Sequence, residues 1–459
     1  MPNDTTKRTY FVLFLLVFMF VLIVAKGLTV VQPGDENVYY YMGKLITEGK
    51  VPYRDFFYAH PPLHLYLIAL VYSIFGFNIV ALKLMPLIST LVSAFFIFKI
   101  SREKFDSNVA LLSSLLFLFA YGTMFNSVFS FGIDIATMFL VIGVYFLIKE
   151  KPFLSGISLG LASITRLLSL IPIIAILVIL FFSNRKKFLK LSSAFLAVFI
   201  FVNGVFALSY FGKYLTPVYK YHTLKSLSER ENFREYADII KLNWMLFSSA
   251  LLFIFAKEKK KVSFFAIASI AYLAFLLLLK KIFGFYFIIV FPFLAILGGY
   301  SAINVYNNLG LKKWLKILAS AILLLVFLWN LSSDTIFLQK IGFKGFERGQ
   351  DIAEFVKSNS NNKTMLFGDD SVTPLLALLT GKKIAFDFVD TNPQVFASGI
   401  KNLSAVLEEL KGRDVLFVMR STQGISSFSE LREFLNRDCS LLSQFHDKIE
   451  GDYLIYNCI

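Results

Sequence analysis

Charged residues are scarce in this chain. They make up 17% of its 459 residues, whereas soluble globular domains carry about 25%. Hydrophobic residues, by contrast, make up 57% of the chain. A chain of this composition is not solvated by water alone, so a purely soluble globular protein is excluded.

Cysteine and histidine are also rare, with two and four residues. Cys439 and Cys458 both lie near the end of the chain, where a disulfide on an extracytoplasmic side is possible but is not established by spacing. His64, His222 and His446 show no metal-ligand spacing. The last 130 or so residues contain no GxGxxG and no P-loop, so nothing there indicates nucleotide binding.

Positive charge exceeds negative charge, and the formal net charge is +15. The Lys and Arg residues do not gather on one basic face, as a nucleic-acid-binding protein would require. They stand in short clusters between apolar segments, which is typical of the cytoplasmic loops of membrane proteins.

Long apolar runs recur from Tyr10 to Asn330. A helix needs about 20 mostly apolar residues to cross roughly 30 Å of hydrocarbon. The runs predict about eleven transmembrane helices, near Tyr10–Val30, Ile79–Ile100, Val109–Phe125, Ile133–Ile148, Phe153–Leu168, Ser169–Ser183, Phe188–Tyr210, Leu242–Ala256, Val262–Leu279, Gly284–Val305 and Trp314–Asn330. Arg166 and Pro172 argue for a hairpin or broken pair over 153–183, although one long tilted helix stays open.

The segment Pro61–Phe77 decides the topology. If it does not span, the basic clusters from Lys7/Arg8 to Lys312/Lys313 all fall on one side, as the positive-inside rule requires. We therefore predict a multi-pass protein of the plasma membrane with a juxtamembrane helix at this segment. Its N-terminus is expected to be cytoplasmic and its C-terminal domain extracytoplasmic. The polar segment Phe211–Lys241 then lies outside too, as a cover over a site or as a solvated connector.

After Leu331 the density of charged and polar residues rises to ordinary globular levels. We therefore predict a membrane domain at 1–331, with a first outer loop at 31–78, and a soluble domain at 332–459. Within the latter, helical and strand-like patterns alternate, which predicts a small α/β fold. The expected elements are helices at Asp351–Ser358, Val372–Leu379, Leu403–Leu410 and Phe428–Leu435, and strands at Thr364–Phe367, Lys383–Phe386, Val415–Met419, Leu441–Phe445 and Tyr453–Tyr456.

Ionisable groups at the mouth of a helical bundle are candidate functional residues. The first outer loop concentrates them: Asp35 and Glu36 follow the first helix, and His60 precedes a Pro-Pro pair. A plainer explanation of Gly-Asp-Glu is a turn followed by a helix N-terminus, where acidic residues are ordinary.

The order GDENVYYYMGKLITEGKVPYRDFFYAHPPLHLYLIALVYSIFG resembles the first extracytoplasmic loop of GT-C glycosyltransferases, the group of protein O-mannosyltransferases and lipid A aminoarabinose transferases. Ser130-Phe131-Gly132-Ile133-Asp134 stands where such enzymes carry an acidic residue in the second loop. The helix end from Gly156 to Arg166 resembles their GLA-x-LT(K/R) motif, and Tyr286 with Pro292 resembles their late Y-x-L-x-x-x-P helix.

The chain also departs from that pattern. Relatives often have Glu-Lys-Pro-Pro-Leu where this chain has Ala59-His60-Pro61-Pro62-Leu63, so an acid is missing and His replaces Lys. The second loop has Asp134 but no Asp-x-Asp, which weakens a metal-dependent mechanism. No cofactor is therefore expected; a divalent metal stays possible but has no Asp-x-Asp motif to support it.

The resemblance implies an inverting transfer of a sugar from a polyprenyl- or dolichyl-phosphate donor to an acceptor hydroxyl on a protein, lipid or glycan. It implies Asp35 as general base, with Glu36 and Asp134 as further catalytic carboxylates. The expected donor-phosphate residues are Arg166, His60, Lys280, Lys281 and Tyr286.

Each basic residue also has a structural explanation. Arg166 could snorkel or pair with Asp134, Lys280 and Lys281 could anchor a helix end, and His60 could cap the juxtamembrane helix. A transporter or lipid-linked sugar flippase is the competing class of protein, but no internal repeat accompanies the charges. A scaffold with an external binding domain would leave the outer-face acids and bases unused.

Overall fold

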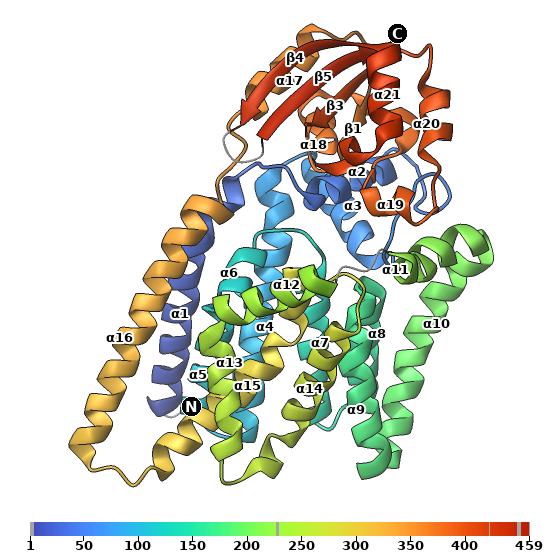
Figure 1. The fold of residues 1–459 in the computed structure, drawn as a ribbon. Coiled ribbons are helices and arrows are strands. Elements are labelled where there is room, and N and C mark those ends of the chain that lie inside the picture. The colour runs from blue at the N-terminus through green and yellow to red at the C-terminus, as the bar shows by residue number, and fades with distance from the viewer. Residues whose placement is uncertain (1–3, 226–228, 422, 448–450, 459) are drawn as a thin grey trace. The chain divides into compact units, whose positions relative to one another are not determined.

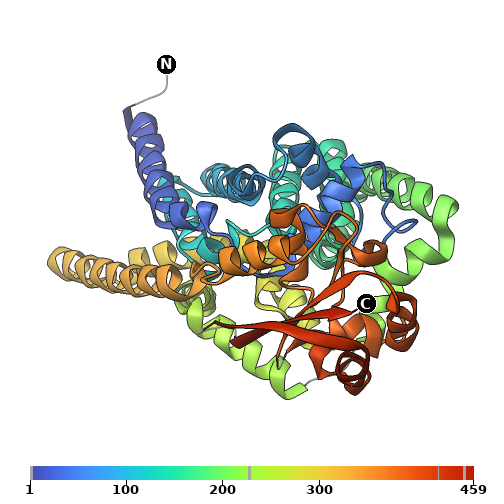
Figure 2. The same ribbon diagram turned by 90° about the horizontal axis from the view of Figure 1, so that it is seen from above.

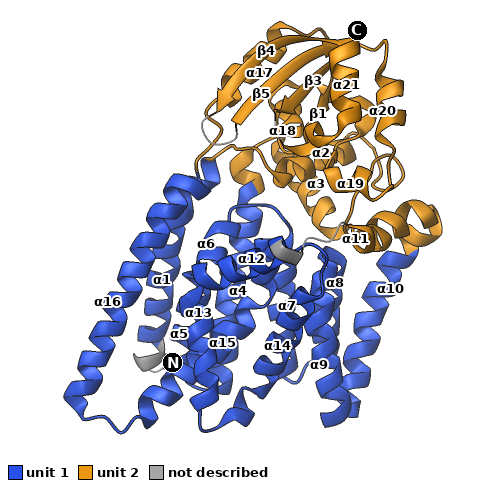
Figure 3. Cartoon of the chain, in the orientation of Figure 1, with its two compact units in different colours: residues 1–29, 83–204, 228–343 blue, residues 30–82, 205–227, 344–459 orange. Residues whose placement is uncertain are grey.

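The computed structural model describes residues 4–225, 229–421, 423–447 and 451–458. The chain divides into two compact units, which Figure 3 colours separately. Unit 1 comprises residues 1–29, 83–204 and 228–343, and unit 2 comprises residues 30–82, 205–227 and 344–459. Unit 2 is thus assembled from three separate stretches of chain.

Unit 1 is helical (Figure 1). Within the described ranges, four helices are long and apolar enough to span a membrane, or five if one bent pair counts as one span. The four are α1 (Asp4–Thr29), α4 (Ile79–Lys104), α10 (Arg185–Leu215), which continues into unit 2, and α16 (Lys313–Phe337). The chain is therefore a multi-pass membrane protein, while the count of about eleven spans stays a prediction.

Shorter helices complete unit 1. They are α5 (Ser107–Leu118), α6 (Tyr121–Asn126), α7 (Ile133–Ile148), α8 (Pro152–Thr165), α9 (Leu170–Ser183), α12 (Glu229–Leu242), α13 (Trp244–Leu251), α14 (Ser263–Leu277) and α15 (Phe291–Asn308). The polar segment at 211–241, expected as a cover or a connector, is mostly helical. It contains the end of α10 and α12. Its residues 226–228 lie outside the described residues.

Two adjacent glycines allow helix α15 to pack closely between α5 and α13. A Cβ atom on Gly298 would lie 2.4 Å from Oγ of Ser249, and one on Gly299 would lie 2.3 Å from Oγ of Ser113. Small residues favour helix association in membranes because the backbones can approach. The Gly-Gly pair therefore allows α15 to pack closely against both neighbouring helices.

Helix α16 lies at the periphery of unit 1 (Figure 2). Only 6% of its most apolar window is buried, and Leu324 and Leu325 are 57% and 66% exposed. An apolar helix this exposed requires lipid around it.

The predicted broken pair over 153–183 is confirmed. Helix α8 ends at Thr165, Arg166 is extended (φ −147°, ψ 124°), and a short 3₁₀ turn at Leu167–Ser169 leads into α9. The break leaves the Arg166 side chain at a helix end rather than in mid-helix.

Unit 2 contains a five-stranded sheet in the order β2-β1-β3-β5-β4. Strands β1 (Met365–Gly368), β2 (Lys383–Ile384) and β3 (Val415–Arg420) are parallel. Strands β4 (Cys439–Asp447) and β5 (Gly451–Cys458) form an antiparallel pair beside β3, seen as the two red strands in Figures 1 and 2. Cys439 and Cys458 are directly opposite each other and form a disulfide.

The helices of the sheet region are α17 (Gly349–Ser358), α18 (Thr373–Thr380), α19 (Pro393–Ala397), α20 (Leu403–Leu410) and α21 (Ser429–Asp438). The predicted alternation of helices and strands is confirmed, apart from two details. Strand β2 is shorter than expected, because Phe386 turns to a φ of 55° within a 3₁₀ turn, and α19 was not predicted. The solubility of this region and the functional boundary at residue 331 stay predictions.

Two helices from the first predicted loop belong to unit 2. These are α2 (Asp35–Thr47) and α3 (Leu63–Phe75), which pack together, and α2 also packs against α18. The hydroxyl of Tyr41 accepts a hydrogen bond from the Ile384 backbone at 2.8 Å. Helix α3 has 13 residues, about 20 Å at 1.5 Å per residue, and its place at the outer membrane surface stays a prediction.

Candidate active site

The N-terminus of α2 presents two adjacent carboxylates. Asp35 is exposed, whereas Glu36 is 1% exposed and accepts a hydrogen bond from the Tyr40 hydroxyl at 3.1 Å. The backbone just before them is fixed, because Gly34 N–H donates to the Ser371 carbonyl at 2.9 Å. The helix does begin at Asp35, as the plainer explanation requires, but only Asp35 of the two is accessible to a second molecule.

His60 lies within an aromatic cluster of unit 2. Its ring stacks on that of His222 at 5.5 Å between centroids, and Tyr39 and Tyr58 approach its edge. The His60 carbonyl accepts a hydrogen bond from the Tyr53 hydroxyl at 2.7 Å. His60 is thus held firmly in place, although it does not cap α3, which begins at Leu63 after Pro62 without a side-chain cap.

Asp134 and Arg166 are both buried in unit 1. Asp134, in the first turn of α7, is 2% exposed, and its Oδ1 accepts from Thr90 Oγ1 at 3.2 Å. Its Oδ2 has no hydrogen-bond partner among the described residues. Arg166 is 3% exposed and donates through Nη2 to the Phe131 carbonyl. The suggested ion pair between Arg166 and Asp134 is absent from the described contacts of Asp134.

Tyr286 lies close to the same turn of chain. It is 9% exposed, in a 3₁₀ helix at Gly284–Ile289. The neighbouring Phe285 stacks on Phe131 at 4.8 Å, and Tyr272 donates to the Tyr286 carbonyl at 2.8 Å. The structure therefore brings the Tyr286 segment, Arg166 and the start of α7 together in unit 1.

Lys280 and Lys281 behave differently. Lys281 pairs with Glu231 of α12 at 2.6 Å, while Asn232 binds the carbonyls of Leu279 and Lys280. These contacts fasten the end of α14 to α12. Lys281 could bind a phosphate only if that ion pair opened.

A buried lysine escaped the sequence reasoning. Lys83 of α4 is 0% exposed; its Nζ donates to the Gly27 carbonyl at 3.2 Å and lies 4.6 Å from the Phe129 ring centroid. A lone lysine inside an apolar run is a functional candidate by itself. That signal was present in the sequence, since Lys83 is the only charged residue between Ile79 and Ile97.

Carboxylates at the edge of the sheet were also missed. Parallel strands β1 and β3 end side by side, and Asp369 there pairs with Arg420 at 3.0 Å. Asp370 is 7% exposed. Burial, together with Asp369, Asp35 and Asp390, holds the pKa of Asp370 well above its usual range, and burial raises the pKa of Asp390 to about 6. An edge with several carboxyl groups thus lies in the same unit as Asp35.

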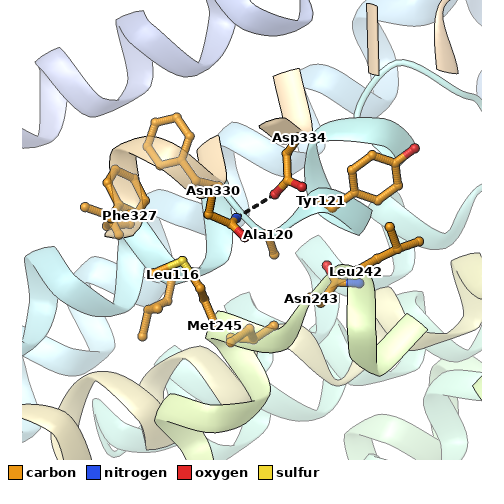
Figure 4. A pocket seen from close by; sticks show the side chains of 12 residues that line it. Leu116, Ala120, Tyr121, Leu242, Asn243, Met245, Phe327, Asn330 and Asp334 are labelled. Atoms are coloured by element: carbon orange, nitrogen blue, oxygen red, sulfur yellow. Dashed lines mark hydrogen bonds between the residues drawn. The ribbon is translucent and has the colours of Figure 1, made fainter. Parts of the chain in front are cut away.

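Figure 4 shows a pocket of unit 1 lined by residues of α5, α6, α12, α13 and α16. Asn330 donates to Asp334 at 2.7 Å and accepts from Trp244 at 2.6 Å. The described lining contains no Lys or Arg, so this pocket does not suit a phosphate. It shares Leu116 and Phe327 with an apolar cavity of about 510 Å³, which suits a hydrocarbon chain.

No three His, Cys, Asp or Glu side chains of the described residues are placed to hold a metal ion. The expectation that the protein needs no cofactor stays a prediction.

Comparison with known families gives a match over part of the chain. Residues 59–210, about a third of the chain, match the family described as dolichyl-phosphate-mannose-protein mannosyltransferase. This segment contains His60, Asp134 and Arg166. A comparison with curated proteins finds no match.

Solved structures match almost the whole chain. The crystal structure of ArnT from Cupriavidus metallidurans bound to undecaprenyl phosphate aligns with a TM-score of 0.68 at 14% identity, covering 97% of each chain. The oligosaccharyltransferase AglB from Archaeoglobus fulgidus, in complex with an inhibitory peptide and a dolichol-phosphate, aligns at 0.60 and 11% identity, over 96% of this chain and 74% of that one. The mycobacterial arabinofuranosyltransferase AftD aligns at 0.53 and 14% identity, over 97% of this chain and 40% of that one.

These matches establish the fold. The chain has the GT-C glycosyltransferase fold, and the resemblance drawn from its first loop and helix motifs is confirmed.

Proposed function

We propose that this protein is an integral membrane glycosyltransferase. It moves a sugar from a polyprenyl- or dolichyl-phosphate donor to an acceptor hydroxyl on the extracytoplasmic face, with inversion at the anomeric carbon. The observation that carries the proposal is the buried Arg166 at the α8 break, in a chain with the GT-C fold. A guanidinium kept at a helix end inside a membrane bundle is suited to bind a phosphate in two places.

Asp35 is the general base in this proposal. Its carboxylate takes the proton of the acceptor hydroxyl as that oxygen attacks the anomeric carbon. The exposure of Asp35 supports this role, while Glu36 is engaged by Tyr40 and is inaccessible. Asp134, with one buried oxygen lacking a described hydrogen-bond partner, serves as a second acidic group that binds the sugar or the acceptor.

The bond between the anomeric carbon and the phosphate oxygen breaks in the same step, and the electron pair leaves with the lipid phosphate. Arg166 stabilises the developing phosphate charge. Lys83 is a second cation buried in unit 1 and is added here to the predicted phosphate-binding residues. His60 and Tyr286 contribute hydrogen bonds. A single displacement of this kind inverts the configuration at the sugar.

The central test is an Asp35→Asn variant. Full-length protein is reconstituted in liposomes with a mixed pool of polyprenyl-phosphate sugars and a membrane extract as the source of acceptor. Release of polyprenyl phosphate and incorporation of sugar are measured. Because asparagine cannot accept the hydroxyl proton, transfer should fall by about 10²–10⁴.

Asp351→Asn is the matched control, since Asp351 is an exposed carboxylate of α17 in the same unit. Near-normal transfer by the Asp35 variant would remove Asp35 as the base. Movement of intact lipid-linked sugar across the bilayer, without release of polyprenyl phosphate, would instead identify a flippase.

The proposed orientation has its own test. The disulfide between Cys439 and Cys458 suits an oxidising extracytoplasmic compartment. In intact cells, a membrane-impermeant thiol reagent should label cysteine introduced at Ser358 of α17 but not at Asn108 of α5, both exposed positions. The opposite labelling pattern would invert the topology.

A further inference from the structure

Unit 2 contains a cavity of about 310 Å³ that is separate from the residues assigned above. Three stretches of chain line it: the first loop around Tyr53–Phe57, the segment from Gly212 to Pro217, and Ile400 with Lys401. Its size lies at the lower end of the range of small-molecule sites, which is about 300–1,000 Å³.

The cavity carries a surplus of positive charge. Its lining contains Arg54, Lys213 and Lys401 but only one carboxylate, Asp55. Asp55 is already bound by Arg54 at 2.8 and 2.9 Å and by the Val51 N–H at 2.7 Å. Arg54 therefore keeps the pKa of Asp55 below its usual range, so this carboxylate stays ionised and neutralises only one of the three cations.

The two lysines have no carboxylate partner among the described residues. Lys213 Nζ lies 3.5 Å from the Arg54 carbonyl, and Lys401 Nζ lies 5.6 Å from the Phe388 ring centroid. By contrast, Lys44 and Lys50 of the same unit pair with Glu48 and Asp387. Lys213 and Lys401 thus place two positive charges without a described carboxylate partner in the lining of one cavity.

The wall of the cavity is aromatic and held in place. Tyr53 and Phe56 are 4% and 5% exposed, and Tyr53 packs edge-on against Tyr214 at 4.8 Å. Tyr53 has a φ of 68°, which is unfavourable for a bulky residue. Its N–H donates to the Phe56 carbonyl at 2.9 Å and its hydroxyl to the His60 carbonyl. An aromatic wall beside cations suits a ring-shaped, negatively charged molecule.

We propose that this cavity binds an anionic saccharide, a glycan carrying carboxylate or phosphate groups, through Arg54, Lys213 and Lys401. The assignment of this saccharide as part of the acceptor rests on the proposed function. The proposed binding of the saccharide to the cavity does not. A concave site with aromatic walls favours a saccharide over the flat surface of a bilayer, where exposed basic residues need no cavity.

Binding to purified full-length protein in a neutral detergent tests the proposal. The probes are a tetrasaccharide containing glucuronate, a phosphorylated oligosaccharide and neutral maltotetraose, measured by calorimetry at low and high salt. The variants are Lys213→Glu with Lys401→Glu, the rescue pair Lys213→Arg with Lys401→Arg, and the control pair Lys363→Glu with Lys383→Glu, two exposed lysines of the same unit.

We expect at least one anionic probe to bind, more weakly at high salt, and the neutral probe not to bind. Charge reversal at Lys213 and Lys401 should weaken binding about tenfold to hundredfold, while the arginine pair and the control pair retain it. The identity of the anionic probe that binds shows whether the site prefers a carboxylate or a phosphate group on the saccharide. Equal binding of neutral and anionic probes, or no binding of either, would overturn the proposal.

The Asp35→Asn background separates this proposal from the proposed function. Saccharide binding there should be unchanged although transfer is lost. If binding holds in the wild type but no sugar transfer occurs with any donor, the proposed function fails and the saccharide site stands. If transfer proceeds but charge reversal leaves both binding and the acceptor KM unchanged, the saccharide site fails alone.

Discussion

Two regions of this chain, helix α16 of unit 1 and the sheet region at 344–459 of unit 2, differ in how far they expose apolar side chains. In unit 1, helix α16 exposes a run of leucines, with Leu324 and Leu325 more than half accessible. Between residues 344 and 459, the described large apolar side chains that are exposed are Phe386, Leu441 and Leu442, and many of the others belong to one buried cluster. The difference supports the prediction that hydrocarbon surrounds α16 and that water surrounds the sheet.

The buried charged side chains of the two units also have different partners. In unit 1, Lys83, Asp134 and Arg166 are buried within apolar helices or at their ends, and their described hydrogen bonds are to Gly27, from Thr90 and to Phe131. In unit 2, the buried Asp369 is matched by Arg420 and by two hydrogen bonds from Ser371. Because a buried charge is costly in a membrane, these residues of unit 1 are functional candidates, whereas the ion pair of Asp369 with Arg420 stabilises the fold.

The largest expected effect is on the membrane insertion of helix α16. Leu324→Asp on α16 should impair membrane insertion by about 3 kcal/mol, because a carboxylate near the middle of a spanning helix is excluded from hydrocarbon. Leu441→Asp on β4, at 52% exposure, should change stability by less than about 0.5 kcal/mol. An insertion assay for the first variant and thermal unfolding for the second provide the measurements. Equal, small effects would mean that α16 does not face lipid.

The second prediction sharpens the contrast in buried charge. Arg166→Ala should weaken use of the lipid-linked donor about tenfold to hundredfold, since a charge-assisted phosphate contact contributes roughly 1.5–3 kcal/mol. Donor saturation of purified protein in liposomes measures this effect. Arg234→Ala, a highly exposed arginine of α12, is the control. Normal donor saturation by folded Arg166→Ala protein would leave Arg166 a structural role.

The smallest expected effect concerns Asp390 at the sheet edge. Its pKa in the folded protein is about 6, above the value of about 3.9 in an unfolded chain. The folded state therefore holds the proton more tightly, and stability falls as the pH rises from about 4 to 6. Asp390→Asn should consequently stabilise the protein at pH 7.5 by about 1–2 kcal/mol and have little effect at pH 4.

Chemical unfolding followed at both pH values tests this prediction, with Asp351→Asn as a control that should show no such dependence. A gain in stability of the same size at pH 4 and pH 7.5 would mean that the charge of Asp390 is not the cause.

Local pattern was enough to predict much of this protein. Apolar runs and their basic flanks predicted the helical membrane region, and Arg166 with Pro172 predicted the break between α8 and α9. Alternating patterns predicted every strand of the sheet, because hydrophobic periodicity and turn residues act over a few neighbours. The family motifs within 33–300 predicted the GT-C fold for the same reason: they are short and contiguous.

Tertiary structure alone decided which distant segments share a unit. The contact of Tyr41 with Ile384 joins residues 343 positions apart, and the cavity at Tyr53 needs three stretches of chain. Likewise, only the structure reveals that Lys281 forms an ion pair with Glu231. It also reveals that Lys83 is buried and that Cys439 forms a disulfide with Cys458. Periodicity determines which face of a helix or strand is apolar, but the partner of each face depends on packing across the whole chain, which no local pattern encodes.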